Sequence, residues 1–449
     1  MGGVVVVGGG HAGLQTVASL RAGGYRGGAT VVCAEPHAPY DRPSLSKEML
    51  AGGTDPAAIA MRPRSFFDDR QIALLHDPVV GIDRVRRLLQ LAGGRRLGYD
   101  HLVLATGATP RRLPVPGSGL SGVIELRSLD DALALRASLA RARQAVVVGG
   151  GFIGLEVASA ASARGIDVAV LERGERLLGR AVTPQVSEAV AAHHVAQGAR
   201  LCLGESVTTL IGRYGCVTGV VTGSGQLLPA DLVVVGVGAV PETGLAARAG
   251  LDTADGVVVD GWLTTSDPRI SAIGDCATVR DPATGTTRRL ESVQNATDQG
   301  RYVAARILGE TTSPYTAVPW FWSNQGSLKL QMVKLGPEPD RLVRRGGPHR
   351  FSVLGFRDGL LTAVESVNDP GTHLAARRLL ERVVPLVAAR AAAAPDRGAE
   401  ARGGGGGAWA VARGAPARPT RGPGPWHSGN PRIRRDRRLR HVTPGRRRR

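Results

Sequence analysis

The sequence is poor in cysteine, in aromatic residues and in long apolar runs. Its four cysteines, Cys33, Cys202, Cys216 and Cys276, form no C-x-x-C pair and no metal-ligand spacing. No apolar run approaches the roughly 18 residues of a membrane helix, and the N-terminus lacks the basic flank and cleavage site of a signal peptide. We therefore expect reduced thiols, no metal, no membrane partner and a cytoplasmic location.

Acidic residues are scarce mainly in the last 63 residues of the chain, where arginines dominate. The chain has a formal net charge of +19, and residues 387–449 hold 16 arginines against Asp396, Glu400 and Asp436, a net of +13. The first 386 residues therefore have only +6. Because residues 387–449 are rich in Ala, Gly, Pro and Arg without periodicity, their composition predicts an Arg/Gly/Pro-rich disordered tail.

A strand, a glycine turn, a helix and a second strand follow one another twice in the chain. A β-branched run at 3–7 leads into glycines at 8–13, a helical pattern at 14–21 and a second strand at 29–34. The same order recurs between residues 145 and 171. With 449 residues, two or three domains are expected. The β/α alternation predicts doubly wound parallel sheets.

Both glycine turns have the spacing G-x-G-x-x-G. With 62 glycines in the chain, this pattern is expected about once by chance, so its context matters more than its spacing. Each turn lies between a strand and a helix, and each second strand ends at an acid, Glu35 or Glu172. The three glycines allow a tight turn, a close approach to a pyrophosphate, and helix packing. Two dinucleotide sites are predicted, at Gly8, Gly10, Gly13 and Glu35, and at Gly149, Gly151, Gly154 and Glu172.

The second acid bears on the choice between NADH and NADPH. The Glu172 carboxylate repels a 2′-phosphate and accepts ribose hydroxyls, which favours NADH. Arg173 follows it directly and attracts a 2′-phosphate, so NADPH is the alternative.

Several longer segments resemble a known family. They are YDRPSLSK at 40–47, ATGATP at 105–110, IGD at 273–275, LESVQNA at 290–296 and PWFWS at 319–323. The chain resembles the FAD-dependent pyridine nucleotide-disulfide oxidoreductases over about residues 1–386. Within that superfamily it is similar to the ferredoxin, putidaredoxin and rubredoxin reductases.

The resemblance implies an α/β fold like that of glutathione reductase. Two Rossmann-like, doubly wound dinucleotide-binding domains would be followed by a small α+β C-terminal domain. The implied ranges are an FAD-binding domain at 1–111 and 246–318, an inserted NAD-binding domain at 112–245, and a C-terminal interface domain at 319–386.

The resemblance also assigns residues to the two nucleotides. FAD would occupy the first site and NADH the second. Lys47 and Glu156 would form a charged pair near the flavin and the nicotinamide, and Trp322 would cover the flavin; these three are the predicted catalytic residues. Trp320 is interpreted as core, and His11 as a bystander. The further positions that match FAD contacts are Ala12, Arg42, Val79, Ala105, Thr106, Gly107, Arg127, Gly274, Asp275, Glu291 and Val293, and those that match NAD contacts are Ile153 and Gly238. Val79 and Val293 suit a core position equally well.

The missing cysteines predict where the electrons go. Glutathione-reductase relatives have a C-x-x-x-x-C pair and thioredoxin reductases a C-x-x-C pair, and this chain has neither. A reduced flavin must then deliver electrons directly to an external acceptor. FAD accepts a hydride and can release electrons singly. We expect NADH to reduce FAD, and FAD to reduce a ferredoxin or rubredoxin that serves an oxygenase or a cytochrome P450.

Two other functions remain open at this point. The acceptor of the same enzyme could be oxygen, monodehydroascorbate or a quinone. Alternatively, a basic flavoprotein similar to apoptosis-inducing factor would bind nucleic acid through the arginine-rich tail. The tail also allows a frameshift near residues 384–387, because GC-rich codons read out of frame produce Ala, Gly, Pro and Arg. The oligomeric state is left undetermined.

Overall fold

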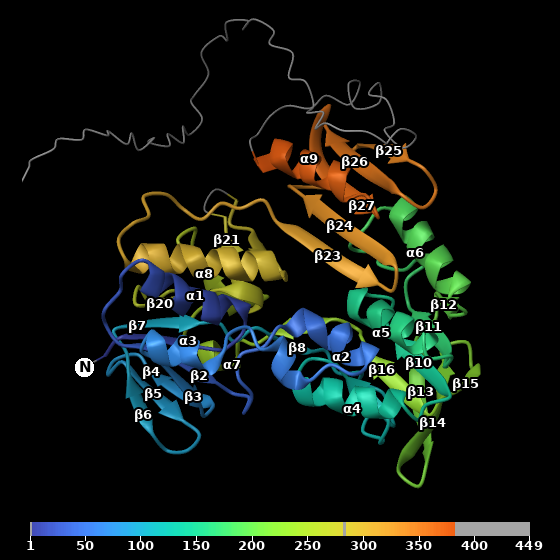
Figure 1. Cartoon of the computed structure of the whole chain (residues 1–449), viewed down its shortest axis with the longest axis horizontal. Helices are drawn as coiled ribbons and strands as arrows, with labels where there is room; N and C mark the ends of the chain where they lie inside the picture. Colours follow the sequence, from blue (N-terminus) through green and yellow to red (C-terminus); the bar gives the residue numbers. More distant parts are fainter. Residues whose placement is uncertain (1, 282–283, 382–449) are drawn as a thin grey trace, which may run out of the picture. The chain divides into compact units, whose positions relative to one another are not determined.

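The computed structural model describes residues 2–281 and 284–381, and two five-stranded parallel sheets organise them (Figure 1). The strand order is β20-β7-β1-β2-β3 in the first sheet and β12-β11-β10-β16-β9 in the second. The strands of the first sheet are β1 (Val4–Val7), β2 (Ala29–Cys33), β3 (Ile72–His76), β7 (His101–Leu104) and β20 (Ile270–Ala272). Those of the second are β9 (Val123–Glu125), β10 (Gln144–Val148), β11 (Asp167–Glu172), β12 (Arg200–Leu203) and β16 (Leu232–Val235).

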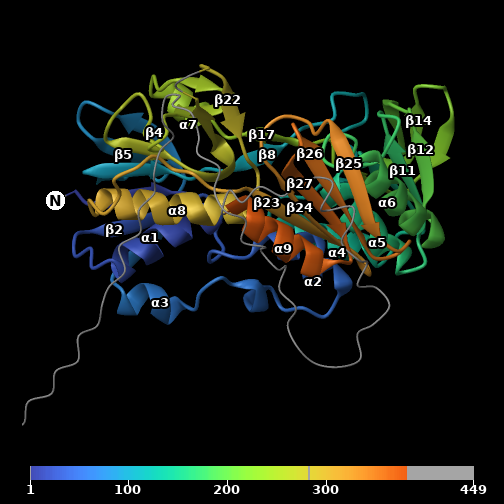
Figure 2. The same ribbon diagram turned by 90° about the horizontal axis from the view of Figure 1, so that it is seen from above.

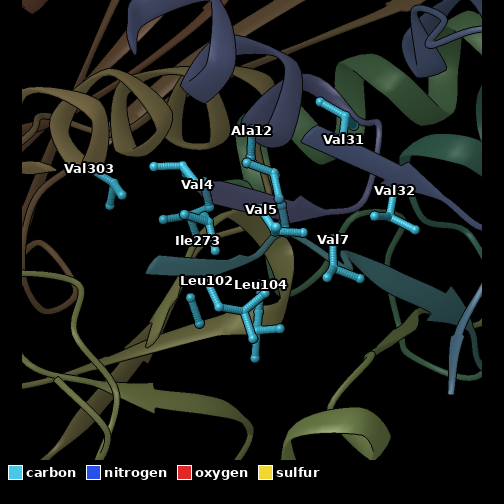
Figure 3. Packing of buried hydrophobic residues seen from close by; sticks show 14 of the residues in the cluster. Val4, Val5, Val7, Ala12, Val31, Val32, Leu102, Leu104, Ile273 and Val303 are labelled. Carbon is cyan, nitrogen blue, oxygen red and sulfur yellow. The ribbon is translucent and has the colours of Figure 1, made fainter. Parts of the chain in front are cut away.

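The first sheet is the centre of a hydrophobic core. Parallel strands covered on both faces need apolar side chains at successive positions, and the four valines of β1 are all buried. Figure 3 shows Val4, Val5 and Val7 packed among residues of β7, α1 and α8. Helix α1 (His11–Ala22) lies along α8 (Val293–Ile307), as both ribbon views show (Figures 1 and 2).

Several smaller sheets accompany the two parallel sheets. One strand pair, β8 (Ala108–Pro110) with β17 (Ala239–Pro241), is antiparallel and lies where the chain passes to and from the second parallel sheet. The remaining strands are β4 (Val79–Asp83), β5 (Leu88–Leu91) and β6 (Arg96–Gly98); β13 (Val207–Arg213), β14 (Cys216–Thr222) and β15 (Leu227–Pro229); and β18 (Thr253–Ala254), β19 (Gly256–Val259), β21 (Ala277–Arg280) and β22 (Thr287–Arg289). Since β20 returns to pair with β7, the chain re-enters the first sheet after the second is built. The domain ranges given above stay predictions.

Most of the helices begin directly after a glycine or a polar residue, whereas α3 follows Pro63. The predicted helix at 14–21 starts earlier, at His11, because Gly10 is its N-cap and the glycine turn carries no apolar period. Helix α4 (Leu129–Leu139) starts with a capping box formed by Ser128 and Asp131. The other helices are α2 (Glu48–Ala51), α3 (Arg64–Asp69), α5 (Phe152–Ser162), α6 (Pro184–Ala196) and α7 (Gly244–Arg248), and the 3-10 turns are η1 (Arg42–Ser46), η2 (Pro56–Ile59) and η3 (Gly274–Cys276).

The C-terminal part is a five-stranded antiparallel sheet with one helix. Its order is β23-β24-β27-β26-β25, and α9 (Pro370–Glu381) packs against β27 and β24 (Figure 2). Its strands are β23 (Trp320–Gln325), β24 (Leu328–Lys334), β25 (Arg341–Gly346), β26 (Phe351–Arg357) and β27 (Leu360–Val367). The predicted fold class, two doubly wound sheets and an α+β C-terminal domain, is confirmed. None of the helices in the described ranges combines the length and apolar character needed to span a bilayer.

Candidate active site

One cavity of about 2530 Å³ receives both glycine turns. Its wall contains every predicted site residue except Gly13 and Gly154. The turns after β1 and β10 both face it because ligands of open α/β sheets bind beyond the carboxyl ends of the strands. The structure therefore joins the two predicted dinucleotide sites in a single space.

The first and third glycines of each turn are required by packing. At Gly8, φ is +115°, and a Cβ would lie 2.1 Å from the carbonyl oxygen of Ala105. A Cβ on Gly13 would lie 2.0 Å from the carbonyl oxygen of Gly8. The second turn repeats both features at Gly149 and Gly154. The third glycines thus pack the helix on the turn and do not reach the cavity.

The middle glycines are different, because they border open space. No atom lies within 4 Å of a Cβ built on Gly10, and the nearest atom to one on Gly151 is 3.8 Å away. Both have ordinary extended backbone, with φ of −75° and −85°. Each is the N-cap of its helix, where unpaired N–H groups favour a phosphate. This cradle fits the pyrophosphates of FAD and NADH.

The first acid, Glu35, lies in the cavity wall with two donors of the chain. Its carboxylate accepts a hydrogen bond from Arg42 at 2.6 Å and one from the Tyr40 hydroxyl. Arg42 also donates to the carbonyl oxygen of Arg127 at 2.8 Å. Burial raises the pKa of Tyr40, so its hydroxyl keeps its proton and can donate. Tyr40 was not among the predicted site residues, although the segment YDRPSLSK contains it.

The second acid, Glu172, holds the loop around its own strand end. Its carboxylate accepts from the backbone N–H groups of Gly150 at 2.8 Å and Gly174 at 2.7 Å. Arg173 is exposed and lines the cavity too. The structure therefore brings both predicted determinants of the NADH or NADPH choice to the same wall.

Asp275 comes from the second segment of the first fold. It pairs with Arg127 at 3.3 Å, and burial raises its pKa while Arg127 opposes that rise. The preceding Gly274 has φ of +73° and donates its N–H to the Gln299 side chain at 2.7 Å. Gln299 is fully buried in α8 and was missed, because nothing in its local sequence marks it.

The other predicted FAD and NAD contacts take their places in the same wall. Val79 lines the cavity and also packs against the first core cluster, so its position is compatible with both interpretations. Val293 is the first residue of α8, directly after its N-cap, and lies in the wall as well. The remaining lining residues of this set are Ala12, Ala105, Thr106, Gly107, Glu291, Ile153 and Gly238.

Lys47 and Glu156 meet inside the cavity wall although they are far apart in sequence. The Lys47 Nζ lies 2.8 Å from the Glu156 Oε2, and the Glu156 residue is only 4% exposed. Two hydroxyls also donate to this carboxylate, Ser46 to Oε2 and Ser323 to Oε1, the latter at 2.6 Å. Both serines lie within the segments YDRPSLSK and PWFWS, but neither was a predicted site residue.

Aromatic rings from β23 form another side of the cavity. Trp320 and Trp322 have ring centroids 5.2 Å apart, and both line the cavity. They share a face because side chains two apart in a strand point the same way. Trp320 also packs against the core of the C-terminal domain, with Arg377 over its ring at 4.8 Å. The interpretation of Trp320 as core is therefore only part of its role.

His11, interpreted as a bystander, is attached to the segment beside the predicted flavin site. Its Nε2 lies 3.0 Å from an Asp41 carboxylate oxygen. Asp41 also accepts from the Ser44 hydroxyl at 2.6 Å and the Ser44 N–H at 3.2 Å. The hydrogen bond from His11 is the largest cause that lowers the pKa of Asp41, and Ser44 adds to it. The contacts make His11 an anchor of the η1 turn.

The four cysteines are free thiols, as predicted. Cys33 lines the cavity, but burial raises its pKa to about 11, so it is protonated at neutral pH. Burial also raises the pKa of Cys276. Since the thiolate is the reactive form, neither buried cysteine is poised for redox chemistry. Among residues 2–281 and 284–381, no cluster of His, Cys, Asp or Glu is suited to a metal ion.

Comparisons with known proteins agree with this geometry. Residues 2–300 match the family model "Pyridine nucleotide-disulphide oxidoreductase", and residues 320–397 match "Reductase C-terminal". Rhodocoxin reductase of Rhodococcus erythropolis is 45% identical over 392 residues, which are 87% of this chain and 92% of that protein. Rubredoxin-NAD(+) reductase of Pseudomonas putida is 41% identical over 82% of this chain and 96% of the relative.

Solved structures show the same likeness. A ferredoxin reductase from Rhodopseudomonas palustris is 46% identical, with a TM-score of 0.84 over 86% of this chain and 96% of that one. The covalent putidaredoxin reductase–putidaredoxin complex is 36% identical to this chain, with a TM-score of 0.82 over 86% of this chain and 94% of that one.

Proposed function

Because this chain belongs to the pyridine nucleotide-disulphide oxidoreductase family, we propose that it is an FAD-dependent NADH:ferredoxin or NADH:rubredoxin reductase. The observation that carries the proposal is the single cavity into which both glycine turns open, with the Lys47–Glu156 pair in its wall. FAD fits the turn at Gly8 and NADH the turn at Gly149. When bound, FAD can accept a hydride and release its electrons one at a time.

The residues of the chain hold, orient and shield the two nucleotides. The helix N-termini at Gly10 and Gly151 bind the phosphates. The Lys47 ammonium favours negative charge on the reduced ring, and Glu156 holds that ammonium in place. Trp322 lines the cavity, where its indole would cover the flavin and exclude water. Because there is no cysteine pair, the electrons pass outward to a separate protein.

The acceptor is a small iron-sulfur protein that serves an oxygenase or a cytochrome P450. Rubredoxin reductases and putidaredoxin reductase are among the relatives, at 41% and 37% identity over most of this chain. The cytoplasm is the compartment that we propose, because free thiols suit a reducing environment. The arginine-rich tail, on which the nucleic-acid alternative and the frameshift hypothesis depend, lies outside the described residues.

The test is a visible spectrum of the purified full chain followed by anaerobic titration with NADH and, separately, NADPH. We expect a bound-flavin spectrum that bleaches with NADH at lower concentrations than with NADPH. Ferredoxin, rubredoxin, oxygen, monodehydroascorbate and a quinone are then compared as acceptors, and an iron-sulfur protein should give the fastest turnover. A colourless protein that cannot be reconstituted with FAD would contradict the proposal, as would a flavin that NADH does not reduce.

A further inference from the structure

Glu156 accepts three hydrogen bonds, and they come from two separate segments of the chain. The residue itself is on α5, while Ser46 and Lys47 come from the region of η1, and Ser323 comes from β23. Lys47 and Ser46 share Oε2, and Ser323 alone donates to Oε1. The orientation of the Oε1 side of the carboxylate therefore depends on the C-terminal domain.

The direction of the hydrogen bonds beyond Ser323 follows from elementary chemistry. An ionised carboxylate only accepts, so the single hydroxyl proton of Ser323 is committed to Glu156. The Ser323 oxygen lies 3.5 Å from Gln325 Nε2, and it can therefore only accept there. The Gln325 amide must then present its nitrogen to Ser323 and its oxygen to the other side.

The other side of the Gln325 amide meets a fully buried histidine on α6. The His194 Nε2 lies 2.9 Å from the Gln325 Oε1, so this ring nitrogen carries the proton. Burial lowers the pKa of His194, which keeps the ring neutral with one N–H, and within the described structure its Nδ1 has no hydrogen-bond partner. His193, the preceding residue, donates to the Gln325 backbone oxygen at 2.9 Å. Gln325 is thus held by hydrogen bonds at both its side chain and its backbone.

We propose that Ser323, Gln325 and His194 are positioning residues that orient the Glu156 carboxylate through one directed chain of hydrogen bonds. In this series of hydrogen bonds, His194 donates to Gln325, Gln325 donates to Ser323, and Ser323 donates to Glu156. Ser323 and Gln325 lie on the face of β23 opposite Trp320 and Trp322, since side chains alternate along a strand. The aromatic wall and the carboxylate are consequently set by the same strand. The inference rests on the proposed function, in which Glu156 lies beside the nicotinamide.

The test is a pair of double-mutant cycles that combine Ser323→Ala or Gln325→Leu with Glu156→Leu. Leucine approximates the volume of glutamate but accepts no hydrogen bond. With rapid mixing, we expect Ser323→Ala and Gln325→Leu each to slow flavin reduction by NADH about tenfold, because small misplacements in a site cost up to about a hundredfold. In the Glu156→Leu background, neither change should slow the reaction further, because the carboxylate that accepts the last hydrogen bond of the series is gone.

Thermal unfolding of the same variants supplies a readout that needs no NADH. Ser323→Ala should lower the Tm more in the parent than in the Glu156→Leu background, where only the long contact with Gln325 Nε2 remains to be lost. Ser352→Ala is the matched control, since Ser352 is fully buried in the same sheet and pairs with Ser366 at 2.7 Å instead. Ser352→Ala should give the same loss of Tm with or without Glu156.

Equal losses for Ser323→Ala in both backgrounds, by rate and by Tm, would overturn the inference, because a merely structural serine behaves in that way. An unreduced parent flavin would instead refute the proposed function, and the Tm cycle would still decide whether the chain of hydrogen bonds couples Ser323 to Glu156.

Discussion

At the scale of single residues, one half-buried and one buried histidine make stability depend on pH. Burial lowers the pKa of both His101 and His373 to about 4, with smaller contributions from Arg306 and Arg377 respectively. An unfolded histidine takes up a proton below about pH 6.5. Between about pH 6.5 and pH 4, the unfolded chain therefore binds more protons than the folded one, and stability falls as the pH falls.

His373→Leu should reduce this dependence and stabilise the protein in mild acid. His373 is 3% exposed, and neither of its ring nitrogens has a hydrogen-bond partner among the described residues. Each such histidine contributes a slope of up to about 1.4 kcal/mol per pH unit in this range. Urea unfolding at pH 7.5, 6 and 5 measures the slope for the parent and for the variant.

The control for this prediction is His349→Leu, because the side chain of His349 is exposed in the same domain. It should leave the slope unchanged. The prediction is refuted if His373→Leu loses as much stability between pH 6 and pH 5 as the parent protein does.

At the scale of elements, the two glycine turns have the same construction but are expected to hold different nucleotides. Gly10 and Gly151 occupy equivalent N-cap positions with backbone angles that alanine tolerates. A methyl group at either position would lie in the cavity without a steric clash, since no atom lies closer than 3.8 Å to the added Cβ. One substitution of the same kind can therefore separate the two sites.

Gly10→Ala should fold normally and weaken FAD binding about tenfold or more, because its Cβ occupies the approach of the pyrophosphate. Gly151→Ala should keep the flavin and raise the KM for NADH by a similar factor. The flavin absorbance per chain and steady-state kinetics distinguish the two outcomes.

Two further glycines calibrate this experiment. Gly119→Ala, at an exposed turn with open space and no place in the cavity, should change neither property. Gly13→Ala should impair folding itself, because its Cβ would lie 2.0 Å from a backbone oxygen. If Gly151→Ala lost the flavin while Gly10→Ala kept it, the assignment of FAD and NADH to the two turns would be reversed.

At the scale of the whole molecule, net charge predicts how the carrier protein is attracted. Residues 1–386 have a net charge of +6, and the tail adds +13. If the carrier is acidic, charge complementarity should speed the encounter, and salt screens that attraction over a length of about 8 Å at physiological ionic strength. Both parts of the chain are therefore candidates for the attraction.

We expect electron transfer to an acidic ferredoxin to slow several-fold as salt rises from about 0.05 to 0.5 M. Flavin reduction by NADH should change less, because it depends mainly on contacts inside the cavity. Carrier reduction measured at each salt concentration, with and without residues 387–449, assigns the effect. If residues 1–386 attract the carrier, the salt dependence should survive the deletion. If the salt dependence disappears, residues 387–449 provide the attraction.

The sequence by itself determined the features that are local. Gly8, Gly10 and Glu35 were found because a tight turn, an open N-cap and a strand-end acid all lie within 28 residues, and their requirements are set by φ and by the absence of a Cβ. The same holds for the second turn. The alternation of strands and helices was likewise legible in the sequence, because buried parallel strands need consecutive valines.

Only the tertiary structure decided which distant polar groups meet. Glu156 lies 110 residues from Ser46 and 167 from Ser323, and its partners follow from how α5 packs against η1 and β23. The contact of His11 with Asp41 and the burial of Gln299 have the same origin. A hydroxyl or an amide has no sequence period that announces its partner, because the geometry of a hydrogen bond is fixed only when separate elements are packed together.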